Sequence, residues 1–217
     1  MKFKALILSV FSLMSSGCLS LPTLQTGRTV GKNNVDVSLN GSYGKYSQNS
    51  VLDFEGEFDY KPVFGIRGNY GITQRIDLGF NLDQTSFVGP SFKYQFLGDQ
   101  NSLLASSIGV EGGVLFGAFL FGNFTNYLTI PLYTSTHPTE HLAIHFTPRF
   151  VYTSEYIFAS PTEGSLGLAS KLSFFTNTYG FVVGKNNKVA LEISSHRGHF
   201  FKPSQISIGY ILSLRNL

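Results

Sequence analysis

The sequence predicts an all-β fold: a single antiparallel up-and-down transmembrane β-barrel of about ten strands, preceded by a signal peptide. Charged residues make up only 13% of the 217 residues, whereas soluble domains typically carry about 25%. Aromatic residues reach 15%, and beyond the N-terminal leader no stretch offers the roughly 20 continuous apolar residues of a membrane helix. Apolar and polar residues alternate with a period of two in many segments, which indicates strands with one apolar face.

The alternation is clearest in 75–83. Its even-numbered positions hold Ile, Leu, Phe and Leu, and the odd-numbered positions after Arg75 hold Asp, Gly, Asn and Asp. Strands are expected at 34–44, 64–72, 75–83, 88–96, 102–116, 126–136, 142–152, 165–178, 188–196 and 206–214. A barrel of eight to twelve strands is compatible with this pattern. The stretch 165–183 is long for one strand, which suggests a β-bulge.

The connections between these segments alternate between two lengths. Short polar turns are expected at 73–74, 98–101, 137–140 and 184–187. Longer connections are expected at 45–58, 117–125, 154–164 and 197–204, and the brief connection 84–87 belongs to this second set by its order. Short periplasmic turns alternating with longer external loops are typical of an up-and-down barrel. An even number of strands then leaves both termini at the periplasmic end.

Alternation alone does not say which face points outward, because a soluble lipocalin-like barrel also alternates. The scarcity of charges favours the membrane barrel, since a charge facing lipid at the bilayer centre costs about 2–4 kcal/mol. The polar face would then line the lumen, where buried charges need partners. We expect a luminal polar network of Asp36, Arg67, Asp77, Asp83, Lys93, Glu111, His145, Arg149, Lys171 and Glu192. Such a network would plug a narrow lumen or line a narrow pore.

The N-terminus has the features of a secretory signal peptide. Two lysines precede an apolar run from Ala5 to Met14, and small residues follow it. The only cysteine, Cys18, comes directly after this leader and resembles the lipobox cysteine of bacterial lipoproteins, which implies an acylated thiol on the first mature residue. We therefore divide the chain into a signal peptide (1–17), a periplasmic tether (18–33) and the barrel (34–217).

Several stretches resemble small bacterial outer-membrane β-barrel lipoproteins, most closely the hairpin sequence Tyr-Gly-Ile-Thr-Gln-Arg-Ile-Asp-Leu-Gly at 70–79. The others are 24–32, 93–99 and 130–140. The resemblance implies a location in the outer membrane of the cell envelope, with the lipid bilayer as partner. The narrow or plugged polar lumen suggests a structural or passive-transport role. These families largely lack an assigned activity, so no functional residue beyond Cys18 carries over.

A second class of function stays open: an outer-membrane enzyme or a hydrophobic-ligand binder acting at the external rim. The segment 194–199 brings serines and histidines together, and the loop 116–124 is unusually aromatic. His137, His141 and His145 have a helical spacing within a predicted turn and strand, so we expect no metal site there. No cofactor is expected, and the small, scattered net charge of +3 argues against binding of nucleic acid.

Overall fold

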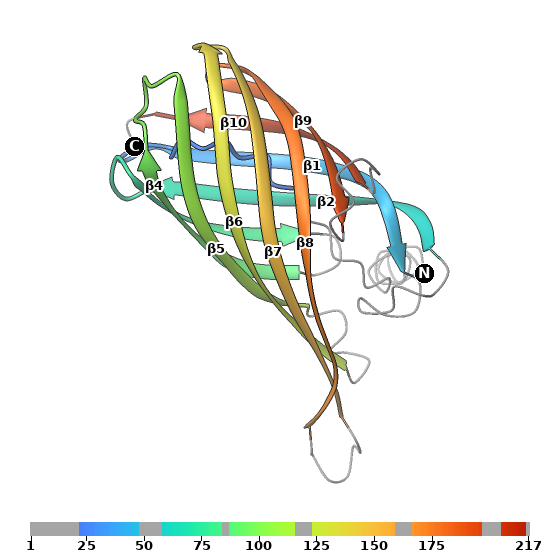
Figure 1. Ribbon diagram of the computed structural model, residues 1–217. Coiled ribbons are helices and arrows are strands. Elements are labelled where there is room, and N and C mark those ends of the chain that lie inside the picture. Colours follow the sequence, from blue (N-terminus) through green and yellow to red (C-terminus); the bar gives the residue numbers. More distant parts are fainter. Residues whose placement is uncertain are drawn as a thin grey trace, which may run out of the picture.

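The computed structural model describes residues 22–47, 58–83, 87–115, 123–158, 166–196 and 205–215 (Figure 1). Ten strands form one closed antiparallel barrel in which each strand pairs with its neighbours in sequence and β1 pairs with β10. The strands are β1 (Val35–Ser47), β2 (Phe58–Gly71), β3 (Ile76–Asp83), β4 (Phe87–Leu97), β5 (Leu104–Leu115), β6 (Asn123–Thr139), β7 (Leu142–Phe158), β8 (Leu166–Gly184), β9 (Asn187–His196) and β10 (Gln205–Leu214). The predicted all-β up-and-down barrel and its strand number are confirmed.

The two ends of the barrel differ. The turns at 72–75, 98–103, 140–141 and 185–186 all lie at one end, which we call the short-turn end. β1 begins and β10 ends there, because Val35 pairs with Leu214. The opposite end, where the longer connections leave the strands, is the loop end.

The strands reach different heights at the loop end. Figure 1 shows β6, β7 and β8 extending beyond the rest of the barrel, whereas β3 has only 8 residues and ends early. The expected bulge in β8 is present, because the register with β7 shifts where Glu155 pairs with Ser170 and Tyr156 with Leu168. Within the described ranges, no helix has the length and hydropathy needed to cross a bilayer.

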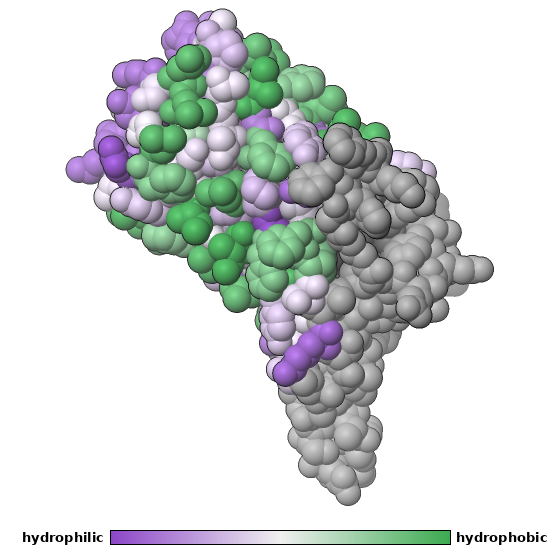
Figure 2. Space-filling view, viewed as in Figure 1, coloured by the Kyte–Doolittle hydropathy of each residue, from purple (hydrophilic) through white to green (hydrophobic). Residues whose placement is uncertain are grey.

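The apolar face points outward, as the low charge content predicts. Figure 2 shows apolar side chains spread over the barrel wall. The exposed belt includes Leu39, Tyr43, Phe64, Ile66, Leu78, Phe80, Phe92, Tyr94, Ile108, Val110, Leu128, Ile130, Ile144, Phe181, Ile193, Ile208 and Tyr210. In β10 the alternation is regular, with Gln205, Ser207 and Ser213 buried between exposed apolar neighbours. The barrel is therefore polar inside and apolar outside, the reverse of a soluble barrel.

The segment Pro22–Asn34, which we call the inner segment, lies inside the barrel except for Lys32 and Asn33, which are exposed. Thr23, Leu24, Thr29 and Val30 are buried, and the segment forms no strand before β1. A periplasmic tether is expected for 18–33, and the described part of that range is held largely within the lumen. The physical reason is that a backbone without regular structure needs hydrogen-bond partners when it is buried, and the polar lumen supplies them. Residues 18–21 lie outside the described ranges.

Candidate functional site

The carboxylates of the lumen accept hydrogen bonds from the backbone of the inner segment. Glu192, near the middle of β9, accepts the N–H of Thr23 at 2.9 Å and the N–H of Leu24 at 2.5 Å, and the hydroxyl of Thr23 also donates to it. Asp77, at the start of β3, accepts the N–H of Val30 through both oxygens, at 2.9 and 3.1 Å. Hydrogen bonds to a charged acceptor are shorter and stronger than neutral ones, so these two acids hold the segment at two heights.

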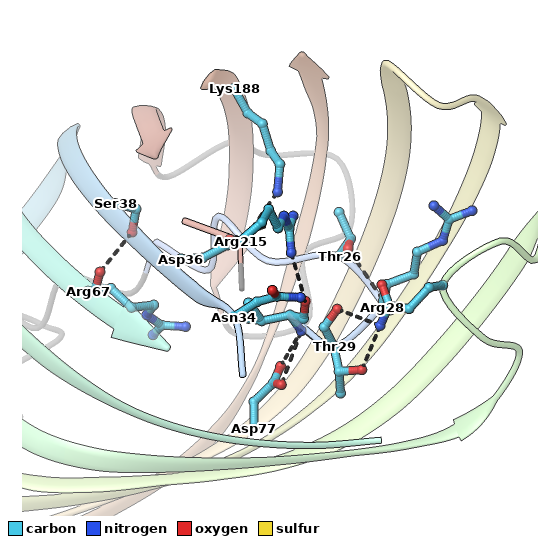
Figure 3. Close-up of polar contacts among 12 residues, drawn as sticks. Thr26, Arg28, Thr29, Asn34, Asp36, Ser38, Arg67, Asp77, Lys188 and Arg215 are labelled. Carbon is cyan, nitrogen blue, oxygen red and sulfur yellow. Dashed lines mark hydrogen bonds and ion pairs between the residues drawn. The ribbon is translucent and has the colours of Figure 1, made fainter. Parts of the chain in front are cut away.

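The cations of the lumen donate to the carbonyl groups of the same segment. Lys93 Nζ contacts the carbonyl oxygens of Thr26 at 2.8 Å and Arg28 at 2.6 Å. Arg215 Nη1 donates to the carbonyl oxygen of Val30 at 2.8 Å, so that Arg215 and Asp77 hold Val30 from two sides (Figure 3). Acidic side chains thus meet N–H groups, and basic side chains meet carbonyl groups.

Uncharged wall residues complete the contacts. Gln95 Oε1 accepts both the N–H and the hydroxyl of Thr29 at 2.9 Å. The N–H of Gly27 donates to Ser135 Oγ at 2.8 Å, and its carbonyl accepts from Ser107 Oγ at 2.7 Å. A Cβ on Gly27 would overlap the carbonyl oxygen of Ala105, so only glycine lets the segment approach the wall this closely.

Leu24 supplies the apolar contact of the inner segment. Its side chain is buried in a small cluster with Ala143, Val182, Ala190 and Ile211. This cluster lies on the inner wall of β7 to β10, where the otherwise polar lining is interrupted. The match between one apolar side chain and one apolar patch fixes the segment in a single register.

An ion pair crosses the lumen near mid-barrel. Arg67 of β2 donates to both oxygens of Glu111 of β5, at 3.1 and 3.0 Å, and both side chains are almost fully buried. The hydroxyl of Tyr133 donates to Glu111 at 2.6 Å, and Arg67 Nε donates to Asn81. A bidentate pair with further hydrogen bonds is the arrangement in which buried charges are best compensated.

A polar cavity of about 490 Å³ opens at the short-turn end. Asp36 lies there, 3.1 Å from Lys188 and 3.9 Å from Arg215 (Figure 3). Arg28 of the inner segment also lines the cavity and donates to the carbonyl oxygen of Ser102 at 2.6 Å. Burial lowers the pKa of the Arg28 guanidinium, and the nearby Asp99 carboxylate partly offsets that effect.

The structure places most of the predicted luminal residues on the inner wall. Asp36, Arg67, Asp77, Lys93, Glu111, His145, Arg149 and Glu192 lie there. Asp83 is half-buried at the end of β3. Lys171 is exposed on the outward face of β8, because the unbroken register with β7 puts it on the same face as the exposed Phe175 and Tyr179. The prediction that it lines the lumen is wrong.

Other partners were missed by the reading of the sequence. Lys188 lies on the polar face of a predicted strand and could have been included by its alternation. Arg215 follows the last predicted strand, and Arg28 belongs to a segment without any periodic pattern. Backbone groups of the inner segment carry no signal in the sequence at all, although they make most of the contacts with Glu192 and Asp77.

The residues that suggested an enzyme or a hydrophobic-ligand binder at the external rim lie only partly within the described ranges. Ser194 lies inside the barrel, where its hydroxyl shares a hydrogen bond of 2.8 Å with that of Thr178. Residues 197–204 and 116–122 lie outside the described ranges, and so does Cys18. Among the described residues, Ser135 Oγ lies 2.8 Å from His137 Nε2 and also accepts the N–H of Gly27.

No protein-family model matches the sequence, and no curated protein matches it. Among solved structures, the fold is similar to the N-terminal β-barrel domain of Pseudomonas aeruginosa OprF (11% identity, 85% of this chain and 99% of that chain, TM-score 0.37). It is also similar to Neisserial surface protein A (8% identity, 85% and 99%, TM-score 0.38) and to Ail, the attachment invasion locus protein of Yersinia pestis (8%, 84% and 96%, 0.33). At such identities the likeness concerns the fold alone.

Proposed function

We propose that this chain is a bacterial outer-membrane β-barrel lipoprotein whose lumen is closed by its own inner segment, with a structural or passive-transport role. The observation that carries this proposal is the fit of Pro22–Asn34 inside the barrel. Wall side chains from β2, β3, β4, β5, β6 and β9 hydrogen-bond to it. A barrel of ten strands is narrow, and a filled interior leaves no wide water-filled path.

The outward-facing belt supports the location in a membrane. Phe64 is 62% exposed, and the apolar side chains above and below it on neighbouring strands are exposed as well. In water such a continuous apolar surface would cause aggregation. In a bilayer the same surface is stabilised by contact with lipid, and closure of the sheet leaves no unpaired strand edge in the hydrocarbon.

The proposed localisation of the protein depends on its N-terminal sequence. Residues 1–17 would be removed as a signal peptide, and Cys18 would carry the acyl chains. The short-turn end would face the periplasm, since short turns lie on that side in barrels of this kind. Mass spectrometry of the mature N-terminus tests the lipid directly: an unmodified Cys18 thiol contradicts the lipoprotein part of the proposal and leaves the barrel part standing.

Planar-bilayer recording tests the closed lumen. The full chain should show no stable single-channel step, whereas a variant lacking 22–31 should show one, because the segment that fills the short-turn half is gone. Glu140→Gln is the matched control, since it weakens an exposed 2.9 Å pair with Lys185 at the short-turn mouth and leaves the inner segment in place. A full chain that conducts as well as the deletion variant would contradict the plug.

Heat-modifiable migration in gel electrophoresis tests the membrane barrel separately. The membrane fraction should contain a compact form that changes its migration on boiling. A chain that stays soluble and shows no change in migration would contradict the membrane assignment.

A further inference from the structure

Basic side chains outnumber acidic ones in the polar cavity of about 490 Å³ at the short-turn end. Its described lining contains three acids and two histidines, together with basic residues from the inner segment, the wall and the rim. These basic residues are Arg28, Lys93, Lys185, Lys188 and Arg215. Ligand sites in proteins usually measure about 300–1,000 Å³, so the cavity has the size of a small-molecule site.

The three acids of this lining are already engaged. Glu140 pairs with Lys185 at 2.9 Å, and Asp36 pairs with Lys188 at 3.1 Å. Asp77 accepts a backbone N–H of the inner segment through both of its oxygens. The carboxylates among the described lining residues therefore leave positive charge uncompensated.

The remaining cations have no acid of their own within the described lining. Lys93 and Arg28 contact neutral carbonyl groups instead of carboxylates, and Arg215 only shares Asp36, at 3.9 Å. A concave surface lined by charges of one sign attracts ions of the opposite sign. The cavity is therefore suited to an anion.

Arg28 keeps a donor that it does not use. Its Nη2 atom donates to the carbonyl oxygen of Ser102 at 2.6 Å, but its Nε atom is buried and makes no hydrogen bond within the described ranges. Asp99 acts on Arg28 through its charge, although that carboxylate lies on the exposed turn 98–103 and accepts from Asn101 and Ser102. Buried donors are nearly always satisfied, and a carboxylate or phosphate group can take two hydrogen bonds from one guanidinium.

The lining also has an apolar part. Leu142 and the cluster of Leu24, Ala143, Val182 and Ile211 border the same cavity. A bare inorganic ion would leave this surface and most of the volume without contacts. A molecule with one charged group and a short carbon skeleton would contact both parts of the lining.

We propose that this cavity binds a small organic anion, whose carboxylate or phosphate group contacts Arg28 and whose carbon skeleton lies against the Leu24 cluster. Asp36 competes with the anion for Lys188 and Arg215, which meet at its carboxylate (Figure 3). The inner segment supplies Arg28, so the segment that closes the lumen also forms part of the site. Only the side of entry rests on the proposed function: with the short-turn end toward the periplasm, the anion would arrive from there.

Calorimetric titration of the folded full chain in detergent tests the site. The probes are glutarate, glycerol phosphate and, as a cation of similar size, putrescine. Low ionic strength is needed because salt screens charges at an open mouth. At least one of the two anions should bind at a single site, and putrescine should not. Binding of glutarate alone assigns the site to carboxylates, and binding of glycerol phosphate alone assigns it to phosphates.

Three variants locate the binding. Arg28→Gln should weaken it by roughly tenfold or more, because a hydrogen bond to a charged group is lost. Asp36→Asn should strengthen it, because Lys188 and Arg215 are released, and a poorly folded variant would not give this gain. Arg75→Gln is the matched control: Arg75 is exposed on a turn at the same end and does not line the cavity. It should bind the anion like the parent chain.

The Nε–H resonance of Arg28 in NMR spectra should shift during the titration, since this donor gains a partner. The site is overturned if neither anion binds, if Arg28→Gln binds as tightly as the parent chain, or if Arg75→Gln weakens binding equally. Failure of Asp36→Asn to strengthen binding would also count against it. These measurements need neither a bilayer nor an acylated Cys18, so their failure is distinct from a failure of the proposed outer-membrane function.

Discussion

Replacing Glu192 with glutamine should loosen the inner segment at its deepest carboxylate contact. The carboxylate accepts two backbone N–H groups and one hydroxyl, whereas the amide keeps one acceptor oxygen and turns two donors toward groups that are themselves donors. At least one backbone N–H then loses its partner in a buried place. Hydrogen bonds to charged groups contribute about 1.5–3 kcal/mol each, and an unsatisfied buried donor costs about 1–3 kcal/mol.

We take about 3 kcal/mol as the loss in local stability of the segment around Thr23, since the individual terms do not add in full. At 1.36 kcal/mol per factor of ten, this corresponds to a roughly hundredfold rise in the population in which the segment has opened. Amide hydrogen exchange of Thr23 and Leu24, followed by NMR in micelles, measures that population. Opening exposes these two amides, whereas in the closed state Glu192 protects them.

The control is Asp36→Asn. Asp36 is also a luminal carboxylate, but it pairs with Lys188 at the short-turn mouth and holds no amide of the segment. It should leave the exchange of Thr23 and Leu24 unchanged. A change of less than threefold in their exchange rate for Glu192→Gln, or an equal acceleration for Asp36→Asn, would refute the role of Glu192 in holding Thr23 and Leu24.

Three further outcomes are expected. Gly27→Val should push the segment off the wall of β5 and raise bilayer conductance, because its Cβ overlaps a carbonyl oxygen; Thr26→Val is the control and should conduct no more than the parent chain. Arg67→Ala should lower the free energy of unfolding in urea by about 3–5 kcal/mol because Glu111 is left buried without its cation, and adding Glu111→Gln should recover part of that loss. Phe80→Lys should cost about 2–4 kcal/mol of folding free energy in lipid vesicles, and equal stability of Phe80→Lys and Phe80→Leu would contradict the lipid-facing belt.

The strands could be predicted because each carries its own signal. Alternation along 75–83 predicts β3 and its outward face without knowledge of any other strand, and a charge such as Asp77 then falls inside by its position alone. The sequence-based prediction assigns Lys171 to the wrong face, because the apolar positions of its strand change from even numbers up to Phe174 to odd numbers from Phe175 onward. The pairing with β7 puts Lys171 on the outward face with Phe175. Where the alternation within a segment is mixed, only the pairing with neighbouring strands decides which face points inward.

The inner segment could not be placed from the sequence. Residues 22–34 have no periodicity, and their position is decided by groups far away along the chain. Glu192, which holds Thr23, lies 169 residues further on. A segment that is held through its backbone groups has no characteristic pattern of side chains in the sequence. A polar stretch before the first strand is therefore interpreted as a tether.

The luminal acids and bases are nearly balanced in number, but in the structure they do not all pair with one another in salt bridges. Among the described residues, Arg67 and Glu111 pair directly, but Asp77 and Lys93 use their charges mainly on the amides and carbonyls of the inner segment. Removing the segment would leave these buried charges facing water or one another, with the loss of several charge-assisted hydrogen bonds. The barrel wall and the segment therefore stabilise each other. It follows that a variant lacking 22–31 should be both more conductive and less stable than the full chain, whereas a passive obstruction would change conductance alone.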